Sequence, residues 1–501
     1  MQYLYGARIH GIQDYIFETN KLREIIGASE ILEHICTKLL TEILGSNYRE
    51  DQLLLGAAGN IRYLFTDSDQ CQTVCEELPL KVKEYSDLLV LSQGVVKIED
   101  NEISGNHLAS IEEILKAQRN LVSHNFSAGL MGRVRARRTG VPAYKLKNYS
   151  TNDSEYLDQT TWKKQEHRNG HILINKISPE INKTNSEKRF TFPTELDQIA
   201  SEANKRWIAV IHADGNSLSK RIGEVLSPES GKDSRKALRA LSTALEQSTQ
   251  IASQKALEEV ISTAAIDEKS PIPFRPVILG GDDLTVIIRA DLALAFTQSF
   301  LKYFEEETRN KFKEIESVNL KEGLTACAGI AFIKEKFPFH YAVEMAEELC
   351  DHAKHRAKAI DADHPPSCLM FYRIQDTYAQ SYQEIISKEL EINKKNNSQE
   401  KLICFDYGPY SVNNQSQLKT IDKLIESYQY LLKDGAPVGK IREWLAEVYT
   451  NPERAKQKLD RICHINPKLA KNLDLYEITL QSGSKERSMI YDLINLHAIG
   501  M

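Results

Sequence analysis

The feature that most constrains the fold is an order of elements that occurs twice along the chain. Apolar periodicity and turn residues indicate, in each half, a strand, a helical stretch, a tight hairpin, a second helix and a strand. In the first half these elements fall at 2–9, 12–44, 52–66, 70–85 and 88–98, with a further helix at 108–125. In the second half they fall at 206–213, 234–262, 276–288, 291–312 and 324–333, with a further helix at 340–360. This order is that of a ferredoxin-like domain, so we predict an α+β chain built on a duplicated unit.

Length and local composition divide the rest of the chain. At about 150 residues per domain, 501 residues correspond to roughly three domains. Residues 148–196 are rich in Asn, Lys, Thr and Glu, which is typical of a linker or a surface excursion. After Pro365-Pro366, helical segments alternate with Gly or Pro, and Lys394-Lys395 indicates a solvated loop. We predict a degenerate ferredoxin-like domain at 1–147, a linker or insertion at 148–200, a second such domain at 201–365 and an all-helical domain at 366–501.

Charge, hydropathy and cysteine spacing exclude several classes of protein. The chain has 64 basic and 70 acidic side chains and a net charge of −6, which argues against a protein coated in nucleic acid. Its apolar runs are too short to cross a bilayer, and its first residues do not resemble a secretory signal. The only close cysteine pair is Cys71 and Cys75, whereas a four-cysteine zinc module needs two such pairs. We therefore expect a cytoplasmic protein with no membrane partner.

The sharpest chemical signal is Gly280-Gly281-Asp282-Asp283, which lies between two apolar strand segments. Glycine permits the positive φ of a tight hairpin and lets a phosphate approach the backbone closely. Asp214 ends the first strand of the same half. In a ferredoxin-like sheet that strand is central and adjoins the hairpin, so we expect the three carboxylates to converge.

Three carboxylates brought together repel one another unless cations neutralise them. Two hard divalent cations, Mg²⁺ or Mn²⁺, would bind Asp214, Asp282 and Asp283 and orient the reacting groups of a phosphoryl transfer. The alternative is a solvated turn, since glycine and aspartate favour turns in any protein. The place of Asp214 in the element order favours the metal site.

Residues around these acids are candidates for holding a nucleotide. A helix is predicted to open just after Asp214, and free backbone N–H groups at a helix start bind phosphate. The lysines among the candidates are also explained as exposed residues of solvated helix faces. The candidates are Gly215, Asn216, Ser217, Lys220, Gly280, Gly281 and Lys354.

Several stretches of the second half together carry a family resemblance: Asp214-Gly-Asn, the diglycine–diaspartate hairpin, Cys327-Ala-Gly-Ile-Ala and Glu344-Met-Ala-Glu-Glu-Leu-Cys-Asp-His-Ala-Lys. They resemble the second palm domain of the large signalling subunit of type III CRISPR effector complexes. Gly11-Ile-Gln-Asp-Tyr-Ile-Phe resembles the start of its first palm domain, and Asp434-Gly-Ala-Pro-Val-Gly-Lys resembles its helical C-terminal domain. The resemblance is strongest over 206–360.

This resemblance implies an activity and a role for each candidate residue. Such proteins are related to GGDEF-type nucleotide cyclases and condense ATP, with divalent metal, into cyclic oligoadenylate second messengers. The chain would then be a nucleotidyltransferase that joins ATP 3′–5′ and releases pyrophosphate, in antiviral defence. The three aspartates would be its metal ligands, the two hairpin glycines would shape the catalytic turn, and Lys354 would contact phosphate.

The first half departs from the family pattern. Its hairpin reads Ala57-Ala58-Gly59-Asn60 and its first strand ends in Arg8-Ile9-His10, so it has no acids in place to hold metal. We interpret it as a pseudo-palm that holds a second nucleotide or only pairs with the active palm. The chain also contains no His-Asp dipeptide and no suitable cysteine pairs, so we expect it to lack the HD nuclease and the zinc element of many family members.

A local basic cluster suggests a second partner. Four arginines, Arg133, Arg135, Arg137 and Arg138, lie within six residues. Clustered cations repel unless an anion receives them, so RNA or a nucleotide is a candidate partner. The alternative is a solvated loop or salt bridges to the many acids of the chain.

Two other functions stay open at this point. One is a catalytically silent nucleotide- or RNA-binding scaffold, which would join CRISPR-like effector subunits or associate with itself. The other is a cyclase that makes dinucleotides or uses another base. Retention of all three acids favours catalysis, because a scaffold gains nothing from clustering them.

Overall fold

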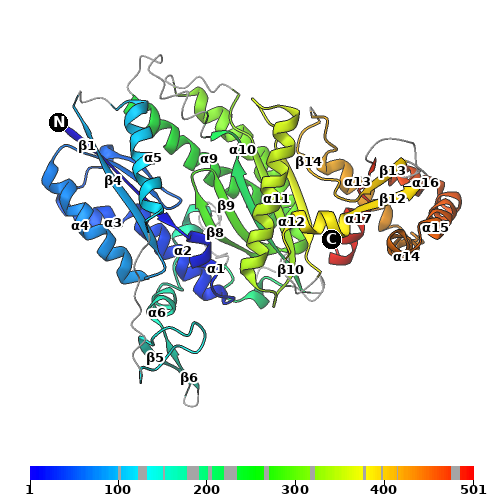
Figure 1. Ribbon diagram of the computed structural model, residues 1–501, viewed down its shortest axis with the longest axis horizontal. Helices are drawn as coiled ribbons and strands as arrows, with labels where there is room; N and C mark the ends of the chain where they lie inside the picture. The colour runs from blue at the N-terminus through cyan, green and yellow to red at the C-terminus, as the bar shows by residue number, and fades with distance from the viewer. Residues whose placement is uncertain are drawn as a thin grey trace.

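The computed structural model is described over most of the chain, and the statements below refer to those residues. They are 1–99, 103–121, 132–150, 153–177, 191–200, 206–218, 220, 234–263, 270–315, 322–375, 380–396, 399–414, 416–475 and 486–501. Figure 1 shows three parts in a row: a first sheet with its helices, a second sheet with longer helices, and a mainly helical part near the C-terminus. Within these ranges, no helix has the length and apolar character needed to cross a membrane.

The first sheet has the strand order of a ferredoxin-like domain. Its order is β2-β3-β1-β4, and each neighbouring pair is antiparallel. The strands are β1 (Gln2–His10), β2 (Leu53–Ala57), β3 (Asn60–Phe65) and β4 (Val90–Ile98). The helices are α1 (Ile12–Phe17), α2 (Leu22–Thr37), α3 (Leu39–Leu44), α4 (Ser68–Tyr85) and α5 (Gly105–Arg119). The predicted order is confirmed, with the helical stretch at 12–44 divided into three helices.

The second sheet repeats this arrangement and extends it. Its order is β14-β11-β10-β7-β9-β8, in which β10, β7, β9 and β8 take the places of β4, β1, β3 and β2. The strands are β7 (Trp207–Gly215), β8 (Phe274–Gly280), β9 (Asp283–Arg289), β10 (Ala326–Lys334), β11 (Cys368–Arg373) and β14 (Tyr410–Ser411). The helices are α9 (Ser234–Thr263), α10 (Ala290–Lys313) and α11 (Phe339–Ile360). Because β11 and β14 belong to this sheet, it continues past the predicted boundary at residue 365.

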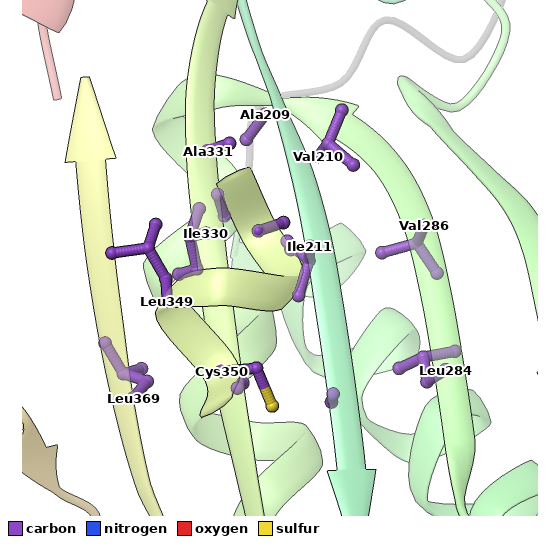
Figure 2. Close-up of a cluster of buried hydrophobic side chains, with 14 of the residues drawn as sticks. Ala209, Val210, Ile211, Leu284, Val286, Ile330, Ala331, Leu349, Cys350 and Leu369 are labelled. Atoms are coloured by element: carbon purple, nitrogen blue, oxygen red, sulfur yellow. The ribbon is translucent and has the colours of Figure 1, made fainter. Parts of the chain in front are cut away.

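Helix α11 crosses the second sheet at very short range because Gly329 of β10 has no side chain. A Cβ on Gly329 would overlap the carbonyl oxygen of Ala346 in α11. Apolar side chains of β7, β9, β10 and β11 lie around this contact, and Figure 2 shows them with Leu349 and Cys350 of α11. This packing brings the later turns of α11 beside the end of β7.

The segment predicted to be a linker contains regular structure. Strands β5 (Lys145–Ser150) and β6 (Asp153–Leu157) pair antiparallel, and helices α6 (Gln159–Glu166) and α7 (Ile172–Ile177) follow. Lys164 of α6 is 1% exposed, and its Nζ donates to the carbonyl oxygen of Tyr15 at 2.5 Å. The polar composition hid α6, because it packs through a buried lysine and a close approach to Gly27 of α2.

The C-terminal part is helical, as predicted, and also contains strands that the prediction missed. Its helices are α12 (Tyr382–Ile385), α13 (Ile421–Leu431), α14 (Val438–Thr450), α15 (Pro452–Ile465), α16 (Pro467–Asn472) and α17 (Ile490–Ile499). Strands β12 (Glu391–Asn396), β13 (Gln399–Cys404) and β15 (Glu486–Arg487) form a separate sheet. Lys394 and Lys395 therefore lie in β12, whose backbone pairs with β13, and not in a loop.

The two ferredoxin-like units meet at their hairpins. A Cβ on Gly280, at the end of β8, would lie 3.1 Å from the backbone nitrogen of Ala58 in the β2–β3 turn. Lys176 of α7 also joins the units, since its Nζ lies 2.5 Å from Glu33 of α2 and 2.9 Å from Glu246 of α9. The acid-free hairpin is thus packed directly against the acid-bearing hairpin.

Candidate functional site

Three carboxylates converge where β7 ends beside the β8–β9 hairpin. Asp214 is the last residue but one of β7, Asp282 lies in the turn, and Asp283 opens β9. Each offers a carboxylate oxygen, and these oxygens all lie within 4.8 Å of one another. In the part of the chain that the structure describes, no other group of His, Cys, Asp and Glu has this spacing. The structure therefore brings together the three acids that the element order indicated.

Two glycines make this convergence possible for different reasons. Gly280 pairs with Asp283 in the β8–β9 ladder, so Gly281 and Asp282 form a two-residue turn. Gly281 has a φ of +62°, as the turns of two-residue hairpins require, and glycine adopts this value without strain. At Gly215, by contrast, a Cβ would lie 2.8 Å from Oδ2 of Asp282. A side chain at 215 would therefore displace the second acid.

Burial and mutual repulsion make these carboxyl groups hard to ionise together. Burial, followed by the charge of Asp214, raises the pKa of Asp282 to about 7. Burial, followed by the charges of Asp282 and Asp214, raises the pKa of Asp283 well above its ordinary value. For all three carboxyl groups to ionise, positive charge is needed close to them, and a bound cation would supply it.

Lys354 of α11 supplies one such charge. Its Nζ donates to Oδ2 of Asp214, and its side chain is 13% exposed. Burial by itself would lower the pKa of Lys354, but the Asp214 carboxylate opposes this effect and the pKa is raised. The predicted phosphate contact thus lies at the acid cluster, where it is engaged with one of the acids.

Other predicted nucleotide contacts are engaged elsewhere. Asn216 is 2% exposed; its Nδ2 donates to Thr325 Oγ1 at 3.0 Å and its backbone N–H to the Thr325 carbonyl at 2.8 Å. Those two hydrogen bonds anchor the end of β7 to the residue that precedes β10. Ser217 has a φ of +60°, and Lys220 is exposed and pairs with Asp363 at 2.6 Å. The helix predicted to open at Asn216 falls mainly outside the described residues.

A cavity of about 230 Å³ lies between the two ferredoxin-like units, next to the acid cluster. Burial, ahead of the neighbouring charges, lowers the pKa of His212 to about 4, so the ring is neutral. The sequence analysis did not predict which residues of the first unit line this cavity, because no local motif shows which of its residues face the other half of the chain. The lining residues include Gly11, Ser29 and Glu33 from the first unit and His212, Gly280 and Asp283 from the second.

The arginine cluster is partly structural. Arg138 donates to Glu155 at 2.7 Å and to Glu24 at 2.6 Å, and its hydrogen bond to Glu155 contributes most to its raised pKa. These two glutamates supply anions for Arg138, which gives it a structural role, and contact of the cluster with RNA or a nucleotide stays a prediction. Arg133, Arg135 and Arg137 are exposed.

Two palm-type sheets, the second with an acid-bearing hairpin, define a palm-domain protein. Residues 207–361 match the family model described as Cas10/Cmr2, second palm domain. Over this range the chain is therefore similar to the second palm domain of Cas10/Cmr2 proteins. No curated protein sequence matches the chain.

Solved structures of Csm1 share the fold along the whole chain. A Csm1–Csm4 cassette in complex with cA4 matches with a TM-score of 0.57 and 13% identity, covering 100% of this chain and 70% of that one. The cassette in complex with cA3 gives a TM-score of 0.56 and 13% identity, with coverage of 100% and 69%. Csm1 of T. onnurineus matches with a TM-score of 0.54 and 15% identity, covering 100% of this chain and 69% of that one. At such identities the likeness establishes the fold alone.

The acid cluster fits divalent cations by its donor set. Carboxylate oxygens are the hard ligands that Mg²⁺ and Mn²⁺ prefer, and three carboxyl groups offer them within 4.8 Å. Lys354 can balance the negative charge of only one of the three carboxylates, so the ionised cluster keeps an excess of negative charge. Asp214, Asp282 and Asp283 are therefore the residues that would hold the metal.

Proposed function

We propose that the chain is a metal-dependent nucleotidyltransferase that joins ATP 3′–5′ into cyclic oligoadenylate, with release of pyrophosphate, in antiviral defence. The observation that carries this proposal is the convergence of Asp214, Asp282 and Asp283 beside the cavity between the two palms. The match of residues 207–361 to the Cas10/Cmr2 second palm domain supports it, as do the Csm1 structures with cA3 and cA4.

Each group of the site has a task in this reaction. A ribose 3′-oxygen forms a bond to the α-phosphorus of a second ATP, the bond from that phosphorus to the departing pyrophosphate breaks, and the hydroxyl proton passes to solvent. Mg²⁺ or Mn²⁺, when bound, would lower the pKa of the hydroxyl and would neutralise negative charge on the departing pyrophosphate. The three aspartates hold the cations, and Gly280 and Gly281 leave the backbone open to phosphate. Lys354 binds a phosphate oxygen once cations neutralise Asp214.

The deciding experiment incubates the purified chain with each of the four NTPs and Mg²⁺ or Mn²⁺ and identifies the products by mass spectrometry. We expect cyclic oligoadenylate and pyrophosphate from ATP, and no product from the variant Asp282→Ala/Asp283→Ala. Product from that variant at the wild-type rate would refute the site. A cyclic product made from another NTP would show that the proposed base is wrong. If no product forms under any condition, including with RNA added, the scaffold function is favoured.

The similar solved structures and the exposed arginines suggest which molecules this chain binds. Several of the similar solved structures are Csm1–Csm4 assemblies, so we propose a Csm4-like effector subunit or a second copy of this chain as the protein partner. We propose RNA or nucleotide contact at the exposed Arg133, Arg135 and Arg137. A filter-binding salt titration of Arg133→Ala/Arg135→Ala/Arg137→Ala should show a shallower slope than wild type. Arg454→Ala/Arg461→Ala, exposed changes in α15, is the control, and equal slopes for all proteins would refute the contact.

A further inference from the structure

Thr249 of α9 reaches the acid-bearing hairpin from a distant part of the sequence. Its side chain is 1% exposed, and its hydroxyl lies 2.6 Å from the Gly281 carbonyl oxygen and 3.0 Å from that of Leu245. A hydroxyl has one hydrogen to donate. Gly281 is the closer acceptor, and the Leu245 carbonyl is the normal acceptor of the helical hydrogen bond from the Thr249 N–H. The hydroxyl is therefore directed at the hairpin.

The Gly281 carbonyl belongs to the peptide group that leads into Asp282. One end of this peptide group, the Gly281 carbonyl, accepts a hydrogen bond from Thr249 at 2.6 Å, and the other end is the backbone nitrogen of Asp282 itself. A peptide group is planar, so an anchor on its carbonyl also fixes the direction of its N–H. The orientation of this one peptide group thus bears on where the Asp282 carboxylate lies.

The turn itself restrains that peptide group weakly. Ladder pairing between β8 and β9 ends at Gly280 and Asp283. At Gly281 an added Cβ would meet no atom within 4 Å, so the Cα of this residue faces open space. Glycine also has the widest backbone freedom of any residue. An anchor from outside the hairpin is what holds such a turn in one orientation.

We propose that Thr249 is a positioning residue, whose hydroxyl holds the Gly281–Asp282 peptide so that Asp282 joins Asp214 and Asp283 in one cation site. The neighbouring α9 residues Ser248, Ala252 and Ser253 are small and buried, and α9 contacts β8, the first strand of the hairpin. The prediction for turnover rests on the proposed function, whereas the prediction for cation binding stands without it.

The test compares four full-length proteins. Thr249→Val keeps the shape of the side chain and removes the hydroxyl, and Thr249→Ser keeps the hydroxyl. Thr297→Val is the matched control, because Thr297 of α10 is equally buried and donates to the Ala293 carbonyl of its own helix at 2.8 Å. Mn²⁺ binding is followed by the loss of the free-ion EPR signal, and turnover of ATP by chromatography, on proteins with native thermal transitions.

We expect Thr249→Val to weaken Mn²⁺ binding about fivefold to tenfold and to lower kcat about tenfold, with KM for ATP nearly unchanged. Thr249→Ser should recover both within about twofold, and Thr297→Val should match wild type. Wild-type Mn²⁺ affinity in Thr249→Val, failure of Thr249→Ser to recover it, or an equal loss in Thr297→Val would overturn the proposal. If Thr249→Val does not fold, Thr249→Ala replaces it. If wild type turns over no nucleotide, the proposed function fails and Mn²⁺ binding alone decides the role of Thr249.

Discussion

Gly215 faces Asp282 across a gap too small for a side chain: a Cβ on Gly215 would lie 2.8 Å from Asp282 Oδ2 and 2.9 Å from Asp282 Cβ. The strand that ends with Asp214 therefore passes directly beside the turn that carries the second acid. The separation of these two carboxylates is set by backbone packing. This gives the glycine a testable role in metal binding.

Gly215→Ala should displace the Asp282 carboxylate and weaken Mn²⁺ binding by about tenfold or more, since a clash with a metal ligand disturbs the whole donor set. Nucleotide turnover should fall with it. The thermal transition should change little, because the displaced group is at the rim of the sheet. Gly439→Ala is the control, since a Cβ there meets nothing within 4 Å. Wild-type Mn²⁺ affinity in Gly215→Ala would contradict this account.

Lys354→Met should remove the cation that pairs with Asp214 while keeping the length of the side chain. The metal-free variant should unfold at a lower temperature than wild type near pH 8, because the acids lose their counter-ion. Mn²⁺ should then raise its transition temperature by more than it raises that of wild type, while turnover falls at least about tenfold. Lys220→Met, at an exposed lysine that pairs with Asp363, should behave as wild type in both measurements. Equal stabilisation of Lys354→Met and wild type by Mn²⁺ would count against the pairing.

Glu347→Gln should remove a pH dependence of stability. Glu347 of α11 has a buried oxygen without a hydrogen-bond partner. Burial, then Asp351 and Glu344 of the same helix and Asp14 of α1, raise its pKa to about 8. Between its ordinary pKa and 8, the folded chain holds a proton that the unfolded chain lacks, so stability falls as pH rises through this window.

Urea denaturation at pH 5 and pH 8 provides the measurement. Wild type should lose at least about 1 kcal/mol more than Glu347→Gln between these values, since each pKa unit corresponds to about 1.4 kcal/mol. Glu453→Gln, an exposed change in α15, should follow wild type. Parallel losses in wild type and Glu347→Gln would show that this carboxyl ionises normally in the folded chain.

Gly329→Ala should destabilise the second palm without touching the acids. Its Cβ would overlap the Ala346 carbonyl oxygen, so α11 would have to move off the sheet. We expect a loss of about 1–3 kcal/mol in unfolding free energy, in the range of overpacked cores. Chemical denaturation measures it, with Gly439→Ala again as control. A variant as stable as wild type would show that the helix is not seated on this glycine.

Local patterns predicted the parts of this molecule that depend on neighbouring residues. The hairpin at Gly280–Asp283 and the end of the strand at Asp214 were recognisable because turn chemistry and strand alternation are short-range signals. Sequence patterns did not reveal that Lys354 pairs with Asp214 or that Asn216 anchors the end of β7, because each contact is made with a distant element. The pairing of β12 with β13 was missed for a different reason, since a lysine-rich strand carries no apolar alternation.

The contact between Gly280 and Ala58 has a consequence for how the two halves of the chain can change. Ala58 has a φ of +49°, a conformation that few residues other than glycine, Asn and Asp adopt readily. A larger residue at 58 would alter the surface on which the other hairpin rests. The half without the acids is therefore held to one shape at this point. A fragment comprising the second palm alone would leave its hairpin without the wall against which it is seated.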